Sequence, residues 1–400
     1  MQKKSVSRKQ PVLTSIRFRY VQCQIDLLSA QRTGKDVLRA LNTMPDSLNG
    51  TYEAALSRIS PYDRNLAREA LLWLTYSWKP ITLSALSEAL VVEKGDSLLD
   101  DQSRLFDPNV ILHICQGLVV YDEDTSTVTL AHSSVRDFLT SAVIRRGPAS
   151  FYSLQEVEGV RCIYRKCLTY LMFDEFCRPC PDNRYLDQRL VDFPLLEYAA
   201  LTWAQYCGNR APPGFELTES ELNEIMDFFD TYTLKSGANY VSWVQVIRSE
   251  ATEDTVWTTE PLYYAASFGI LPAVDTLIRR GANVDSCGGR NSATALNIAS
   301  FRGCYSVVKR LLQAGADPNT KDRADMTSIE WAKEFERRRI IELLLEYGAE
   351  DRLSPPPVIM DLNPPLWICC SCEFANNGTL TAGRCANCGH ISCISCASMS

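Results

Sequence analysis

Three copies of one turn, spaced 34 and then 33 residues apart, place the strongest constraint on the fold of this chain. Each copy contains a Gly-Ala pair that closes a predicted helix. A fixed period of about 33 residues is typical of a solenoid, in which each unit buries its apolar face only against its neighbours. Glycine suits the turn because it adopts a left-handed conformation without a steric penalty from a Cβ atom. The turns lie at residues 280–285, 314–319 and 347–351.

The helical segments before these turns also begin in register. They resemble the start of the ankyrin repeat, Thr-Pro-Leu-His-x-Ala, with the family histidine replaced by Tyr263, Asn297 and Glu330. The resemblance implies about three ankyrin repeats over residues 258–352, which bind a protein partner and carry no chemistry of their own. About three repeats is the minimum for a stable array, so we expect it to lean on the domain before it. The segments lie at residues 261–266, 295–299 and 328–332.

Residues 43–150 show a run of helical patterns followed by two strand patterns. The two strands, at 118–121 and 127–132, flank an acidic turn. Helices followed by a two-stranded wing predict a winged helix. The chain here resembles the winged helix that follows the NTPase in fungal NACHT-type (STAND) signalling proteins, a module also described for GPI inositol-deacylases. The resemblance rests on residues 48–53, 70–74, 104–108 and 130–139.

Residues 151–257 are apolar and helical in pattern, and we interpret them as a connector. Within them, 193–203 is similar to the helical connector that these fungal proteins place before their ankyrin repeats, with Tyr206 in place of the usual histidine. The resemblance covers roughly residues 15–350. It implies a mainly α chain made of a winged helix, a helical connector, an ankyrin solenoid and a small zinc ribbon-like tail.

The chain has no phosphate-binding loop of the Gly-x-x-x-x-Gly-Lys-Ser/Thr type. Residues 33–36 lack the upstream glycine and the hydroxyl that would hold magnesium. We therefore expect no nucleotide hydrolysis. We interpret residues 1–42 as a remnant of NTPase C-terminal helices or as a basic arm. In the family that the chain resembles, the phosphate-binding core would lie upstream of Met1, which predicts a fragment, a short gene product or a degenerate member.

Two other activities are weighed against this scaffold. His132 stands beside Ser133, Ser134 and Asp137, but no Gly-x-Ser-x-Gly elbow occurs, so we interpret the serines as helix caps. We expect no enzyme activity and no small-molecule substrate. DNA binding through the winged helix is an alternative that needs a basic face. Residues 45–150 hold 9 Lys/Arg against 14 Asp/Glu, which disfavours a nucleic-acid partner.

Cysteines divide the chain, because seven of the 16 fall in the last 32 residues. This usage predicts reduced thiols elsewhere and one metal-binding tail at 367–400, after a Pro-rich linker at 353–366. Two Cys-x-x-Cys pairs, twelve residues apart, supply four thiolates to a structural zinc whose binding drives folding. The favoured ligands are Cys369, Cys372, Cys385 and Cys388. Alternative or additional ligands are Cys370, His390, Cys393 and Cys396.

The tail also resembles parts of two zinc modules. Residues 367–376 look like the start of a Ran-binding zinc finger, with a gap to Cys385 that is two residues too long. Residues 388–396 look like the middle of a RING finger, whose last cysteine pair is missing before Ser400. The RING likeness implies an alternative function as a ubiquitin ligase accessory in which the ankyrin repeats choose the substrate.

The remaining composition bounds the compartment and the partners. The net charge is −7, no apolar run approaches the roughly 18 residues of a membrane span, and no secretory signal occurs. We expect a cytoplasmic protein, with the nucleus as the alternative compartment. The sequence thus predicts an intracellular interaction or signalling scaffold that binds a protein partner through its ankyrin repeats and lacks the NTPase module.

Overall fold

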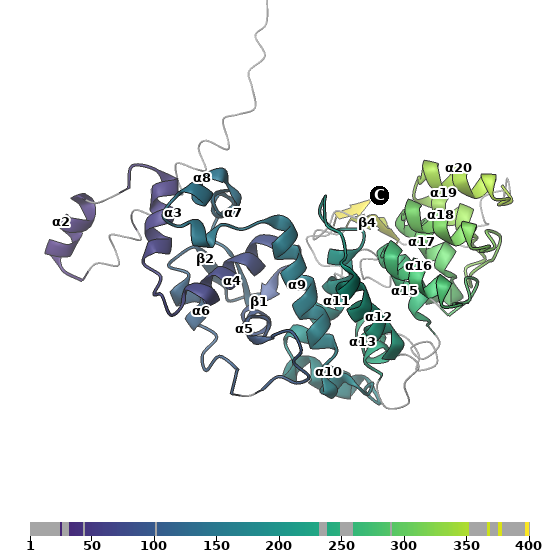
Figure 1. Ribbon diagram of the computed structural model, residues 1–400, viewed down its shortest axis with the longest axis horizontal. Helices are drawn as coiled ribbons and strands as arrows, with labels where there is room; N and C mark the ends of the chain where they lie inside the picture. The colour runs from purple at the N-terminus through teal and green to yellow at the C-terminus, as the bar shows by residue number, and fades with distance from the viewer. Residues whose placement is uncertain are drawn as a thin grey trace, which may run out of the picture. The chain divides into compact units, whose positions relative to one another are not determined.

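The computed structural model describes residues 25, 32–42, 45–100, 102–231, 238–248, 259–288 and 290–351, together with short strands at 366–368, 375–377 and 397–399. Two compact units contain these residues (Figure 1). The first lies within Met1–Val91 and Asp101–Gly159, and the second lies within Val92–Asp100 and Val160–Ser400. The described part is mainly helical, as predicted.

The first unit is built around α4 (Arg64–Tyr76). Alanine and leucine at helical spacing make one face of α4, where Ala67, Ala70 and Leu71 have no exposed surface. Ser47 begins the preceding helix, because its hydroxyl accepts the backbone N–H of Gly50 at 3.1 Å. The other helices of this unit are α2 (Gly34–Asn42), α3 (Leu48–Ser57), α5 (Leu83–Val91), α6 (Val110–Ile114), α7 (Ser133–Thr140), α8 (Ala142–Arg146) and a 3-10 turn at Ser150–Tyr152.

An antiparallel sheet of three strands forms the wing of this unit. The strands β1 (Ile81–Thr82), β2 (Val119–Asp122) and β3 (Thr127–Leu130) lie in the order β1-β3-β2. The sequence predicts the β2–β3 hairpin but not β1, which is two residues long and therefore shows no alternation of polar and apolar residues. The wing completes the winged helix that the sequence predicts.

The connector continues from α9 (Glu156–Leu171), which begins in the first unit and runs into the second. Its core is a set of aromatic rings in edge-to-face contact, with Trp203 and Trp243 at 5.6 Å between centroids and Phe228 at 5.4 Å from Trp203. Such rings supply much apolar area in a small segment. The connector helices are α10 (Asn183–Asp192), α11 (Leu195–Cys207), α12 (Glu219–Asp230) and α13 (Asn239–Ile247), with a 3-10 turn at Asp174–Phe176.

A buried carboxylate joins α9 to α12. Glu221 is 1 % exposed, pairs with Arg161, and lies 3.4 Å from the Nε atom of Arg165. It also forms a capping box with Thr218 at the start of α12. Burial raises the pKa of Glu221, but hydrogen bonds from Arg161 and from the backbone of Thr218 outweigh burial and lower that pKa to about 2. The carboxylate therefore stays ionised and holds the two helices together.

Three pairs of antiparallel helices follow the connector in the same compact unit (Figure 1). Each pair has an inner helix, which lies beside the inner helices of neighbouring pairs, and an outer helix. Leu311 and Leu344 of the outer helices have no exposed surface, so the leucines of the repeat form the shared core. The helices are α15 (Pro261–Phe268), α16 (Leu271–Arg279), α17 (Ala295–Arg302), α18 (Tyr305–Gln313), α19 (Ser328–Glu334) and α20 (Arg338–Glu346).

Three short strands of the tail form an antiparallel sheet. β4 (Leu366–Ile368) lies in the middle and pairs with β5 (Ala375–Asn377) and with β6 (Ala397–Met399). The predicted zinc ligands and the basic segment before residue 25 lie outside the described residues. The zinc ribbon-like tail therefore stays a prediction.

Candidate binding surface

Each outer helix ends in the glycine turn that the sequence singles out. Gly281, Gly315 and Gly348 have φ values of 88°, 90° and 85°, which is the left-handed region. The next residue in each turn donates its backbone N–H back into the helix; Ala316, for example, donates to the carbonyl oxygen of Leu311 at 3.1 Å. The predicted role of these glycines is confirmed, and the turns direct the chain into the loops that present the candidate surface.

A second turn, between the inner and outer helix of each repeat, has the same period but was not noticed in the sequence. Gly269 and Gly303 have φ values of 75° and 81°, and Glu336 occupies the third copy at 52°. A Cβ atom on Gly269 would lie 1.9 Å from the Oδ1 atom of Asn209 in the connector. Glycine is therefore required there by close approach as well as by backbone conformation. The spacing of 34 and 33 residues was the signal that could have found this turn.

Asn297 stands where the ankyrin family has its histidine and takes over the bonding between repeats. Its Oδ1 atom accepts the hydroxyls of Thr294 at 3.0 Å and of Ser328 in the next repeat at 2.7 Å. Its Nδ2 group donates to the carbonyl oxygen of Thr320 at 3.3 Å. The amide is 1 % exposed, so these bonds form without competition from water. Asn297 therefore fixes the register of the second and third repeats.

The loops are joined by a ladder of hydrogen bonds from one repeat to the next. Asp285 accepts the backbone N–H of Asp317 at 2.9 Å. Asn319 donates to the carbonyl oxygen of Gly348 at 3.1 Å and accepts the N–H of Glu350 at 2.8 Å. These bonds use the Asp or Asn that follows each glycine turn. The loops therefore form one continuous edge with a defined shape.

Small residues set the curvature of the array. Ala265, Ala299 and Ala332 have no exposed surface, and the inner helices that carry them contact one another more closely than the outer helices do. The array therefore curves toward its inner helices, which places them on the concave side. The outer helices are held by polar contacts instead. Asp275 of α16 accepts Arg310 of α18 at 2.7 Å, and this hydrogen bond lowers the pKa of Asp275.

The connector covers the inner helix of the first repeat. Tyr264 and Phe268 of α15 are 5 % and 9 % exposed, and their rings lie 4.9 and 6.0 Å from that of Trp243. The hydroxyl of Tyr240 donates to the carbonyl oxygen of Thr259 at 2.9 Å. The array leans on the domain before it, as expected. Its surface for a partner is consequently concentrated in the second and third repeats.

The second and third repeats combine aromatic and charged groups. Phe301 lies 5.4 Å from Trp331 and 4.6 Å from Phe335, so the rings of two inner helices form one cluster. Charged side chains are exposed on the loop between these repeats and at the end of α19. They are Arg323, Asp325, Lys333 and Glu334. We call these four residues the charged rim.

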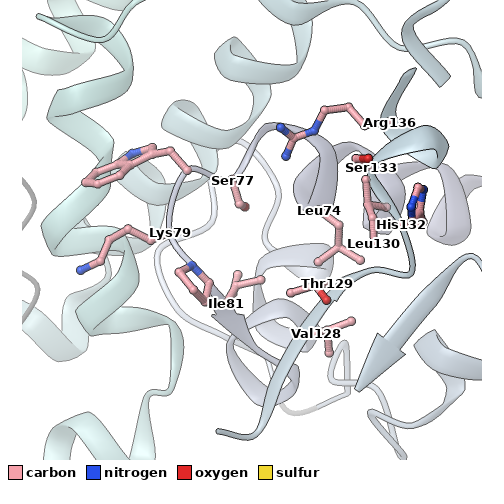
Figure 2. Close-up of a pocket in the computed structure, with 12 residues that line it drawn as sticks. Leu74, Ser77, Lys79, Ile81, Val128, Thr129, Leu130, His132, Ser133 and Arg136 are labelled. Atoms are coloured by element: carbon pink, nitrogen blue, oxygen red, sulfur yellow. The ribbon is translucent and has the colours of Figure 1, made fainter. Parts of the chain in front are cut away.

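A cavity of about 360 Å³ lies in the first unit (Figure 2). It is bordered by the end of α4, strand β3 and the start of α7, and Arg136 of α7 extends toward Ser77. The charged residues among its described lining are the cations Lys79 and Arg136, while Asp, Glu and Cys are absent from that lining. The cavity therefore presents hydroxyls and positive charge but no carboxylate or thiol that could act as a nucleophile.

The structure explains His132 as a helix cap. Its Nδ1 atom accepts the backbone N–H of Ser134 at 3.1 Å and lies 2.7 Å from the hydroxyl of the same residue. That hydroxyl also contacts the hydroxyl of Tyr52 at 2.8 Å. The interpretation of Ser133 or Ser134 as the cap is therefore corrected, because α7 begins at Ser133 and His132 is its N-cap. Histidine is an uncommon cap, so the sequence gave little signal for it.

Cysteines of the described ranges are all free thiols, and most are buried. Burial raises the pKa of the Cys115 thiol to about 12 and raises the pKa values of Cys167, Cys207 and Cys304 as well. Among the residues that the structure describes, no group of three or more His, Cys, Asp or Glu side chains is arranged to hold a metal ion. A zinc site therefore depends on the cysteines beyond residue 351.

Comparison with known proteins supports both modules. Residues 237–322 and 262–355 match the ankyrin repeat family in three copies. Residues 56–152 match the winged helix domain of the GPI inositol-deacylase family. The chain contains a winged helix of this type and ankyrin repeats. The predicted identity of these two parts is therefore confirmed.

Similar proteins share either most of the chain or the repeats alone. The azaphilone pigments biosynthesis cluster protein L of Monascus ruber is 27 % identical over 302 residues, which cover 69 % of this chain and 61 % of that protein. This chain therefore spans about three fifths of that fungal relative's length. The ankyrin repeat and SOCS box protein 6 of Homo sapiens is 37 % identical over 87 residues, or 21 % of each chain. A putative ankyrin repeat-containing protein of Treponema pallidum is 37 % identical over 82 residues, covering 20 % of this chain and 28 % of that protein.

Each described helix is too short or too polar to cross a lipid bilayer. Residues 33–36, which were compared with a phosphate-binding loop, lie at the start of α2. The hydroxyl of Thr33 accepts the backbone N–H of Asp36 at 3.2 Å, as a helix cap does.

Proposed function

We propose that this chain is a non-enzymatic scaffold that captures a protein partner with the second and third ankyrin repeats. Ankyrin repeats indicate a protein–protein interaction scaffold. The observation that carries the finer proposal is the coverage of the first repeat, whose inner helix is buried against Trp243 of the connector. A partner on the concave side therefore reaches the second and third repeats, where Arg323, Asp325, Lys333 and Glu334 are exposed.

The charged rim supports a partner with complementary charges of both signs. Its four side chains comprise two cations and two anions, so no single sign of charge dominates. Exposed charges at the rim of an interface set association rate and specificity more than they set affinity. The rings of Phe301, Trp331 and Phe335 lie in the same two repeats and supply the apolar contact that dominates binding energy in interfaces.

The absence of catalysis is part of this proposal. In the first unit, the His132 and Ser134 pair is explained as a helix cap, and the cavity beside it has no carboxylate or thiol in its described lining. The described thiols have raised pKa values where they are buried, which disfavours a reactive thiolate. A role in transmitting a signal from an NTPase on a separate or adjoining segment is compatible with this scaffold.

We further propose that a structural zinc folds the tail and that the protein works in a reducing compartment, the cytoplasm or the nucleus. Thiolates of the tail supply the ligands that zinc prefers. The free thiols in the described ranges support a reducing environment, because secreted chains of this cysteine content usually form disulfides.

The test compares two triple variants of the full chain. One carries Arg323→Ala, Asp325→Ala and Glu334→Ala in the charged rim. The matched control removes exposed charges from the outer helix α20 with Arg338→Ala, Glu342→Ala and Glu346→Ala. Proteins that co-purify with each chain are quantified by mass spectrometry. We expect a partner to be lost from the rim variant and retained by the control; an unchanged set of partners on the rim variant contradicts the proposal.

A further inference from the structure

The register of the tail sheet fixes which ends of its strands lie together. Ile368, the last residue of β4, is paired with Ala375 at the start of β5 and with Ala397 at the start of β6. Leu366, at the other end of β4, is paired with Asn377 and with Met399. One end of the sheet therefore carries the exit from β4 together with the entries to β5 and β6.

Cysteines adjoin that end in the sequence. Cys369 directly follows Ile368, and Cys396 directly precedes Ala397. Opposite residues of an antiparallel pair have Cα atoms about 4.5–5.5 Å apart. Two thiolates at such positions are within reach of one zinc ion, whose bonds to sulfur are about 2.3 Å long. The Cys-x-x-Cys pairs 369/372 and 393/396 thus flank one end of the sheet.

The third pair is not brought there by the register. β5 leaves the sheet at Asn377, which is paired with Leu366 at the opposite end. Cys385 follows eight residues later, and Cys388 follows three residues after that. The strand pairing gives these two cysteines no fixed place beside Cys369. Spacing alone favours Cys385 and Cys388 as partners of Cys369 and Cys372, but pairing of the strands favours the last pair.

We propose that one zinc is bound by Cys369, Cys372, Cys393 and Cys396, and that Cys385 and Cys388 are not its ligands. This assignment rests on the proposed zinc-binding function of the tail. Strands of three residues do not form a stable sheet by themselves. A metal held by both cysteine pairs cross-links the middle strand β4 to β6 and supplies the folding energy that such a small sheet lacks.

Two double variants of the full chain test the assignment. Zinc is counted by native mass spectrometry, and the same chains are reloaded with cobalt, whose thiolate charge-transfer absorption reports the number of sulfur ligands. We expect Cys385→Ser with Cys388→Ser to keep one ion with four thiolates. We expect Cys393→Ser with Cys396→Ser to lose that ion. The reverse result overturns the assignment, and it leaves zinc binding itself intact.

A measurement on the unchanged chain guards against variants that fail to fold. The chain is supplied with less than one equivalent of zinc and treated with N-ethylmaleimide, and the alkylated cysteines are mapped by peptide mass spectrometry. Protection of residues 369, 372, 393 and 396 before 385 and 388 is the expected result. Earlier protection of 385 and 388 overturns the assignment. A chain that binds no zinc overturns the zinc proposal altogether, while partner capture by the ankyrin repeats is tested separately.

Discussion

The junction between the connector and the first repeat differs from the junctions between successive repeats. At the connector, large rings of Trp243, Tyr264 and Phe268 meet edge to face at centroid distances of 4.9–6.0 Å. Between repeats, buried alanines let the inner helices approach closely, and the Asn297 amide bonds the next repeat. The first junction occurs once in the chain and the second kind recurs with the period of the sequence.

The difference shows how a short array is stabilised at its start. A terminal repeat exposes one apolar face, and repeat proteins usually need a cap with a polar outer surface there. Here the aromatic connector covers that face, so no separate cap is needed. We therefore expect the connector and the array to unfold together, since both lie in one compact unit.

Loss of the central ring at the aromatic junction should give the largest effect. Trp243→Ala removes a side chain that is 1 % exposed, and its indole N–H donates to the carbonyl oxygen of Ala200 at 2.8 Å. We expect a loss of about 3–5 kcal/mol in the free energy of unfolding, because the cavity does not collapse fully. Urea unfolding followed by circular dichroism measures it. As a control, Tyr185→Ala alters a ring that is 62 % exposed, and equal losses from both variants would contradict the prediction.

The buried ion pair of the connector comes next. The pKa of Glu221 is lowered to about 2 from 4.5. A lowered pKa in the folded state contributes stability that is present above pH 4.5 and is lost as the pH falls toward 2. That shift corresponds to roughly 3 kcal/mol. We expect Glu221→Gln to cost about this much at pH 7 and to flatten the acid limb of the stability profile.

A neighbouring acid provides the control for this effect. Glu224 lies on the same helix and pairs with Lys94 at 2.6 Å, but the lysine side chain is 64 % exposed. Exposed ion pairs contribute about 0–1 kcal/mol. Chemical denaturation between pH 2 and pH 8 should therefore show a clear loss for Glu221→Gln and a small one for Glu224→Gln. Similar profiles for the two variants would refute the role of burial.

A junction between repeats should be weaker than the aromatic junction but still measurable. Asn297→Ala leaves the hydroxyl of Ser328 and the carbonyl oxygen of Thr320 without their amide partner. An unsatisfied buried polar group costs about 1–3 kcal/mol, so we expect a loss near 2 kcal/mol. Asn319→Ala removes an exposed bond of the loop ladder and should cost about 0.5–1 kcal/mol. Thermal unfolding of the two variants ranks them, and the opposite order would break the comparison.

Periodic features were predictable and unique contacts were not. The turns at Gly281, Gly315 and Gly348 follow from a spacing that any register of the repeats must respect. The bond between Asn297 and Ser328 depends on side-chain orientation across two repeats, which the period does not specify. The aromatic junction joins residues far apart in sequence, and hydrophobicity alone marks them only as core. Zinc ligands were recognised by composition, while the choice among cysteine pairs needed the pairing of strands.

The smallest expected effect concerns the one repeat that breaks the glycine pattern. Glu336 adopts φ of 52° where the first two repeats have Gly269 and Gly303. A residue with a Cβ atom in this conformation costs roughly 1–2 kcal/mol, partly offset by the greater entropy that glycine loses on folding. We expect Glu336→Gly to raise stability by about 0.5–1 kcal/mol, seen as a higher midpoint in thermal unfolding. The reverse change, Gly303→Ala, should destabilise, because its Cβ atom would meet the Nε atom of Arg337 at 2.9 Å. If Glu336→Gly instead lowers the midpoint, the glutamate has a local partner that outweighs its backbone strain, and the third repeat is not simply a degraded copy of the first two.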